Sequence, residues 1–245
     1  MTHSTRVSRL SFYVTPPHEC SYLDDRDAAT LFADPRFPKS NALYATLSER
    51  GFRRSGEHLY QPHCPGCNAC VPVRVPVAEF QPRRQQRRTW RDNLDLKVEI
   101  KPPVFDDSHF ELYQRYIAAR HPGGGMDDPT PDSYMNFLTA TWADTIFIEF
   151  RQHGELLAVA VADRMPRALS AVYTFFDPAS SARSLGRYAV LYEISLAHET
   201  GRQWLYLGYW IDECQKMRYK TEYQPLEYYR DGEWWCDTGQ SPGRS

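Results

Sequence analysis

The order of predicted elements between residues 146 and 220 constrains the fold of this chain more than any other feature. Three apolar runs separated by short polar turns are typical of antiparallel strands, and they are Ile146–Arg151, Leu156–Ala162 and Leu169–Phe176. Apolar residues then recur at helical spacing from Arg187 to Thr200. A strand at Trp204–Leu207 and a second helix at Asp212–Tyr219 follow. This succession predicts an α/β (α+β) fold in which helices flank a mixed sheet.

The same order is similar to that of GCN5-related N-acetyltransferases. In that family the loop after the third strand presents backbone N–H groups and a helix N-terminus to a pyrophosphate. Here the loop reads Arg183-Ser-Leu-Gly186-Arg-Tyr188, and we expect the tyrosine to crowd coenzyme A, which favours another anionic donor. The resemblance implies a GCN5-related N-acetyltransferase-like mixed sheet flanked by helices, with an N-terminal Cys-containing subdomain. A coenzyme A-dependent N-acetyltransferase remains an alternative.

The chain is predicted to divide near residue 100. Residues 1–100 form an N-terminal region with a cysteine cluster and a basic stripe, and residues 101–245 form an acyltransferase-like domain. In the first region we expect a short strand at Phe12–Val14, a helix at Asn41–Arg50 and a strand at Val71–Val77. Pro72 and Pro76 would confine that last strand to a sheet edge. In the second, a helix is expected at Phe110–Arg120 and a hairpin at Leu226–Trp235, which turns at Asp231-Gly232.

Arginines gather locally although the whole chain has a net charge of only −2. Between Arg53 and Arg91 there are eight arginines and two acidic residues. Five of these arginines share one face of a predicted helix: Arg83, Arg84, Arg87, Arg88 and Arg91. Such a stripe suits the phosphate backbone of a nucleic acid, and a solvated helix face is the alternative.

The six cysteines point to reduced thiols or metal ligands, because no signal peptide or membrane span is visible in the sequence. We therefore expect a cytoplasmic protein. Cys64, Cys67 and Cys70 stand at two-residue intervals, and Cys20 or His63 is a candidate fourth ligand for zinc or an iron–sulfur cluster. Unligated thiols are the other interpretation.

The segment from Tyr206 to Lys220, YLGYWIDECQKMRYK, is the most specific motif in the chain. It resembles the C-terminal signature of aminoacyl-tRNA–protein transferases, and most closely that of bacterial aspartate/glutamate leucyltransferases. Further segments agree with the family in order, namely Gly51–Gly56 with Tyr60, Cys64–Arg74, Arg120-His121, and Tyr173–Pro178 with Ser184–Gly186. The related eukaryotic arginyltransferases hold an iron–sulfur cluster near the cysteines. Their first cysteine pair is reduced here to Cys20, with Leu23 where the second would fall.

The resemblance implies transfer of leucine from leucyl-tRNA to the α-amine of proteins that begin with Asp or Glu, which marks them for degradation by the N-degron pathway. The partners are then leucyl-tRNA and such acidic-start proteins, with no DNA and no membrane. The transfer requires no cofactor, because an α-amine with a pKa near about 7.7–8.0 attacks the ester directly. A non-catalytic, metal-stabilised RNA-binding protein is a further alternative, and spacing alone does not separate a leucyl from an arginyl donor.

Site residues follow from the same resemblance. Tyr209 and Lys216 are the catalytic candidates. Ser184, Leu185 and Gly186 offer backbone donors to the tRNA end, and Arg187 suits a phosphate. The other expected contacts of the aminoacyl-tRNA are Tyr173, Phe175, Tyr206, Trp210 and Lys220, with the stripe residues Arg83, Arg84, Arg87 and Arg88. For Tyr206, Tyr209 and Trp210 core packing is the alternative. Lys216 and Lys220 should share one helix face. Candidates for the acidic N-terminus are Arg53, Arg54, Arg120 and His121, since a guanidinium fits a carboxylate.

Overall fold

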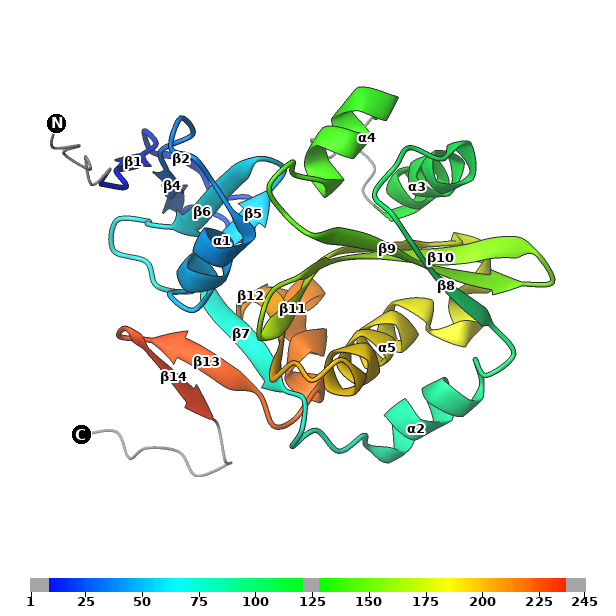
Figure 1. The fold of residues 1–245 in the computed structure, drawn as a ribbon. Coiled ribbons are helices and arrows are strands. Elements are labelled where there is room, and N and C mark those ends of the chain that lie inside the picture. Colours follow the sequence, from blue (N-terminus) through cyan, green and yellow to red (C-terminus); the bar gives the residue numbers. More distant parts are fainter. Residues whose placement is uncertain (1–8, 121–127, 237–245) are drawn as a thin grey trace, which may run out of the picture.

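An eight-stranded mixed sheet forms the centre of the molecule in this computed structural model, which describes residues 9–120 and 128–236 (Figure 1). Its strands are β7 (Val71–Pro76), β8 (Lys97–Lys101), β9 (Thr145–Gln152), β10 (Glu155–Arg164), β11 (Ala168–Phe176), β12 (Trp204–Trp210), β13 (Glu227–Arg230) and β14 (Glu233–Cys236). Their order is β14-β13-β7-β12-β11-β10-β9-β8. The predicted mixed sheet is confirmed.

The predicted meander is also confirmed, because β9, β10 and β11 pair antiparallel in succession. Helix α5 (Leu185–Glu199) then leads to β12, which pairs parallel with β11. The expected hairpin is present as β13 and β14. Each of these elements is specified by local periodicity and short turns, which is why the sequence predicts them well.

Helices cover both faces of the large sheet (Figure 1). On one face lie α5 and α2 (Arg84–Arg91), which together bury a cluster that includes Leu185, Ala189 and Trp90. On the other face lie α3 (Asp107–Arg120) and α4 (Pro131–Leu138), where side chains such as Tyr113 pack onto the sheet. No helix in residues 9–120 or 128–236 is long and apolar enough to cross a membrane.

Two expectations about local structure are wrong. Strand β7 lies inside the sheet between β13 and β12, not at its edge. The interior position is compatible with its prolines because β13 pairs only with Val73 and Arg74, so neither Pro72 nor Pro76 must donate into that ladder. The helix predicted at Asp212–Tyr219 is instead a 3₁₀ segment, η2 (Gln215–Glu222), which follows a turn.

A smaller sheet packs beside the large one. Its order is β1-β4-β6-β5, with β1 (Phe12–Val14), β4 (Thr30–Ala33), β5 (Arg53–Ser55) and β6 (His58–Pro62). Helix α1 (Asn41–Ser48), the strand pair β2 (His18–Glu19) and β3 (Asp27–Ala28), and the 3₁₀ segment η1 (Pro178–Arg183) complete the fold. Strand β7 precedes residue 100 and β8 runs across it, and both belong to the large sheet. The division near residue 100 remains a prediction.

Candidate active site between two diverging strands

Strands β11 and β12 pair over only part of their length. Their parallel register joins Ala168–Ser170 to Trp204–Tyr206, after which β11 continues to Phe176 and β12 to Trp210. The paired residues are mostly buried, whereas Ala171, Gly208 and Trp210 are half-exposed. We call residues 171–176 and 207–210 the strand fork. The fork is a place where main-chain groups of two central strands are free to meet other partners.

Arg53 reaches into the strand fork from β5. Its side chain is almost buried, and its Nη2 donates to Ala171 O at 2.5 Å. Its Nη1 has no hydrogen-bond partner among the described residues. Gly208 lies beside it with a φ of +83°, a backbone conformation that strains any side chain-bearing residue. A Cβ at Gly208 would lie 3.6 Å from Arg53 Nε and 3.7 Å from Lys220 Nζ. The glycine thus brings both cations against the backbone of β12.

Lys220, on η2, is the second cation of the fork. It is 7% exposed, and its Nζ donates to Tyr209 O. Burial first, and then the positive charge of Arg53, lower the pKa of Lys220 to about 7. Within the described chain neither Lys220 nor Arg53 forms an ion pair with a carboxylate. A bound carboxylate would relieve this repulsion and favour the charged lysine.

Glu193 of α5 is a functional candidate that the sequence analysis missed. Its side chain is fully buried, and neither carboxyl oxygen has a hydrogen-bond partner in the described part of the chain. Burial raises the pKa of Glu193 to about 8, although the positive charge of Arg53 acts in the opposite direction. The sequence does contain a sign of this role, because Glu193 interrupts the apolar helix face that Ala189, Val190 and Ala197 share.

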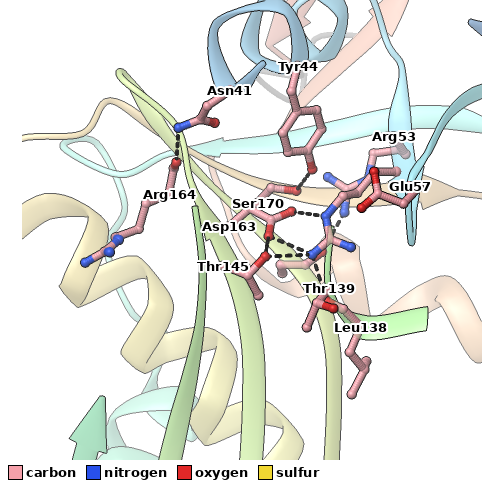
Figure 2. A network of polar contacts seen from close by, with 12 residues as sticks. Asn41, Tyr44, Arg53, Glu57, Leu138, Thr139, Thr145, Asp163, Arg164 and Ser170 are labelled. Carbon is pink, nitrogen blue, oxygen red and sulfur yellow. Dashed lines mark hydrogen bonds and ion pairs between the residues drawn. The ribbon is translucent and has the colours of Figure 1, made fainter. Parts of the chain in front are cut away.

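Arg54, although adjacent to Arg53, has a structural role, and its partners Leu138, Thr145 and Asp163 are labelled in Figure 2. Its Nε donates to Asp163 Oδ2 at 2.5 Å and its Nη2 to Asp163 Oδ1 at 2.7 Å. The same Nη2 also donates to Leu138 O and Thr145 Oγ1. Both side chains of the ion pair are completely buried. Asp163 already accepts from two nitrogens of Arg54, so this guanidinium is not available to a substrate carboxylate. The ion pair instead ties the small sheet to β10.

Three of the aromatic candidates belong to the core. Phe175 is fully buried within the cluster beneath α3. The hydroxyl of Tyr206 accepts from Arg74 Nη1 at 3.2 Å, and that of Tyr209 donates to Gly51 O at 2.9 Å. These three side chains therefore pack in the protein core.

Tyr173 and Trp210 differ from these three because each carries an unused donor. The Tyr173 hydroxyl and the Trp210 Nε1 are buried and lack hydrogen-bond partners among residues 9–120 and 128–236. Burial raises the pKa of Tyr173 far above its ordinary value, so the hydroxyl keeps its proton. One donor lies on each strand of the fork.

The loop before α5 contains the residues that are expected to bind the tRNA end. Ser184 adopts the left-handed conformation with φ +54° and does not cap the helix with its side chain. Leu185 is buried, and a Cβ at Gly186 would approach the Phe176 ring to 3.1 Å, so only glycine fits there without a shift. Arg187 pairs with Glu222 at 3.0 Å.

Tyr188 corrects an expectation about this loop. It is 4% exposed and packs against Trp90 and Phe150, with ring centroids 5.4 Å apart in each pair. The side chain points into the core, so it does not crowd a ligand at the loop. The tyrosine consequently gives no argument against coenzyme A.

The remaining candidates lie on the surface or outside the described chain. Lys216 is exposed whereas Lys220 is buried, so the expected shared helix face does not exist. Arg120 is exposed, and its guanidinium lies 5.6 Å from the centre of the Phe176 ring. His121 lies outside the described residues. The stripe residues Arg83, Arg84, Arg87 and Arg88 are all exposed on or beside α2.

The four cysteines of the expected metal site lie near one another. Burial, followed by the neighbouring Cys64, Cys20 and Cys67, raises the pKa of Cys70 to about 12. The thiol of Cys64 accepts from Ala29 N at 3.4 Å. In the part of the chain that the structure describes, no group of three His, Cys, Asp or Glu side chains is arranged to hold a metal ion. The metal site at these cysteines therefore stays a prediction.

Two surface cavities lie apart from the fork. One of about 510 Å³ is lined by Tyr13, Phe32 and His58 in the small sheet. The other, of about 520 Å³, lies between α2 and α5 beside Trp90 and Ile194. Neither is lined by the charged residues of the fork, so cavity size does not mark the chemical site.

Comparisons with known proteins agree on one family. Residues 18–88 match "Arginine-tRNA-protein transferase, N terminus" and residues 108–230 match "Arginine-tRNA-protein transferase, C terminus". The aspartate/glutamate leucyltransferase of Pseudomonas fluorescens (strain Pf0-1) is 53% identical over 230 residues, which cover 94% of this chain and 98% of the relative. That of Hahella chejuensis (strain KCTC 2396) is 52% identical with the same coverage. The crystal structure of FemX shares the fold, with a TM-score of 0.52 at 9% identity over 85% of this chain and 71% of FemX.

Proposed function

The chain belongs to the arginine-tRNA–protein transferase family, and we propose that it transfers leucine from leucyl-tRNA to the α-amine of proteins that begin with Asp or Glu. It is an aminoacyltransferase. The choice of leucine and of acidic acceptors is supported by relatives of 52–53% identity that are named aspartate/glutamate leucyltransferases. Membership of an enzyme family argues against a non-catalytic RNA-binding protein.

The proposed preference for acceptors that begin with Asp or Glu rests on the two cations in the strand fork. Arg53 and Lys220 are nearly buried, lie against the same glycine and have no carboxylate partner in the described chain. A side-chain carboxylate of an acceptor would pair with them at low local dielectric. An Asn or Gln acceptor would leave the cations without a counter-charge, which is how a buried polar site rejects a neutral analogue.

Positioning and oxyanion stabilisation supply most of the rate in this proposal. The acceptor nitrogen attacks the carbonyl carbon of the leucyl ester and a tetrahedral oxyanion forms. The Tyr173 hydroxyl packs with the cluster beneath α3 and the Trp210 Nε1 with the cluster beneath α5, so the proposal assigns the oxyanion to only one of these two unused donors. The turn at Ser184–Gly186 would hold the tRNA end nearby.

The arginines of α2 are proposed to follow the tRNA backbone. If they do, a double variant with Arg84→Ala and Arg88→Ala should bind leucyl-tRNA more weakly. The slope of log affinity against log salt should also fall, by about one unit for each phosphate that the variant no longer neutralises. Filter binding across a series of salt concentrations measures the slope. Arg36→Ala, in an exposed loop of the small sheet, serves as the control and should leave the slope unchanged. An unchanged slope in the double variant would exclude α2 from the tRNA interface.

A donor and acceptor panel tests the proposed reaction. Purified protein is incubated with leucyl-tRNA, arginyl-tRNA or acetyl-CoA, and with peptides that begin with Asp, Glu, Asn or Gln. We expect mass spectrometry to show leucine added to the Asp and Glu peptides, with roughly 10²-fold or greater preference over the amides. Arginine addition at an equal rate would refute the donor assignment. Acetyl addition without leucine addition would refute the reaction.

A further inference from the structure

Glu193 has no structural explanation in the contacts of the fold. A fully buried carboxyl group normally has hydrogen-bond partners, because burying it without them costs free energy. Glu193 has none among the described residues for either oxygen, and it is not within ion-pair distance of Arg53. A group retained at such a cost is a candidate for function.

The unpartnered groups around the fork can carry charges of opposite sign. Arg53 offers an unused Nη1 and Lys220 an ammonium, while Glu193 offers two unused carboxyl oxygens. Helix α5, which carries Glu193, packs against both β11 and β12, yet Glu193 and Arg53 do not meet in an ion pair. An N-terminal Asp or Glu residue also carries two opposite charges, an α-ammonium and a side-chain carboxylate. The acceptor residue is therefore electrostatically complementary to the two sides of the fork.

We propose that Glu193 binds the α-ammonium of the acceptor and accepts one of its protons, a role that rests on the leucyl transfer proposed above. The proton passes from nitrogen to the carboxylate, and the nitrogen lone pair then forms the new N–C bond. The C–O bond to the tRNA ribose breaks as the tetrahedral intermediate collapses. Glu193 returns its proton to the ribose oxygen, and the second proton lost by the nitrogen leaves to solvent.

The surroundings of Glu193 suit this proton transfer. With a pKa of about 8 Glu193 is mostly protonated at neutral pH before the acceptor binds, and the adjacent α-ammonium favours its ionised form. The proton then moves between groups of similar basicity. The other titratable groups that face it are Arg53, Tyr219 and Tyr223. Burial raises the pKa of Tyr223, and the Glu193 charge acts to raise that of Tyr219, which is 45% exposed. Both tyrosines stay neutral at cellular pH, so Glu193 is the acceptor of the proton on this side of the fork.

A Glu193→Gln variant tests the proposal with two acceptors. One is an Asp-initiated peptide, and the other is its N-terminal aminooxy analogue, whose nitrogen is already unprotonated at neutral pH. With the Asp peptide we expect kcat for leucyl transfer to fall about 10²–10⁴-fold. With the aminooxy analogue the loss should be at least about tenfold smaller, because the initial deprotonation is no longer needed and only the donation of a proton to the ribose oxygen is lost. Glu199→Gln, the same substitution at an exposed position of α5, is the matched control.

The results of these assays distinguish a glutamate that accepts a proton from a purely structural one. A kcat within about twofold of the wild type, or an equal loss with both acceptors, would overturn the proposal, since a purely structural glutamate affects both acceptors alike. Thermal melting should show that Glu193→Gln is at least as stable as the wild type at neutral pH, because the substitution removes a buried ionisable group. Failure of the wild type to leucylate either acceptor would instead refute the underlying function.

Discussion

Asp163→Ala should lower the free energy of unfolding by about 3–5 kcal/mol, the cost typical of removing one partner from a fully buried ion pair. Arg54 would then lie in the interior without a counter-charge, and its Nη1 already has no partner in the described chain. Thr145 Oγ1, which donates to Asp163 Oδ1 at 2.7 Å, would lose its acceptor as well. Denaturant titration followed by tryptophan fluorescence measures the change.

Asp144→Ala provides the matched comparison for that result. Asp144 also pairs with an arginine, Arg164, at 2.6 Å, but both side chains are more than 40% exposed. Solvent screens this pair, so its loss should cost less than about 1 kcal/mol. Equal effects of the two substitutions would show that Arg54–Asp163 does not hold the small sheet on the large one.

Local patterns in the sequence predict the elements of this fold but not which of them become neighbours. The meander, α5 and the final hairpin each follow from a short stretch of periodic sequence. The interior place of β7 depends on pairing with β12 and β13, which come much later in the chain. Pro72 suggested a position at the sheet edge. The sequence of the strand does not show that β13 pairs with only two of its residues and so leaves Pro72 outside that ladder.

The candidate site shows the same limit. Arg53 and Arg54 are adjacent and chemically identical, and the sequence does not distinguish them. Only the fold separates them, because Arg54 meets Asp163, 109 residues away, while Arg53 meets the backbone of Ala171. Glu193 could have been singled out as an acid on an apolar helix face, but the sequence does not show that the strand fork lies beside it.

Arg53→Ala should abolish most of the preference for acidic acceptors. Removing one partner of a buried charge pair costs about 2–5 kcal/mol, so the ratio of kcat/KM for Asp over Asn peptides should fall roughly 30-fold or more. Arg53→Lys should restore only part of the preference, because an ammonium lacks the paired donors that fit a carboxylate. Competition between the two peptides in one reaction, read by mass spectrometry, gives the ratio directly.

The ratio of kcat/KM for Asp over Asn peptides is informative even if Arg53→Ala destabilises the protein. Arg53 also bonds to Ala171 O, so its loss is expected to weaken the contact between β5 and β11. Unfolded protein contributes to neither product, and the fraction of active enzyme cancels from a competition measured in one tube. Arg120→Ala supplies the contrast, because that guanidinium is exposed and solvent weakens its hold on a carboxylate. If Arg120→Ala lowered the ratio while Arg53→Ala left it intact, the acidic side chain would bind at the surface beside Phe176, and the cations of the fork would serve another step.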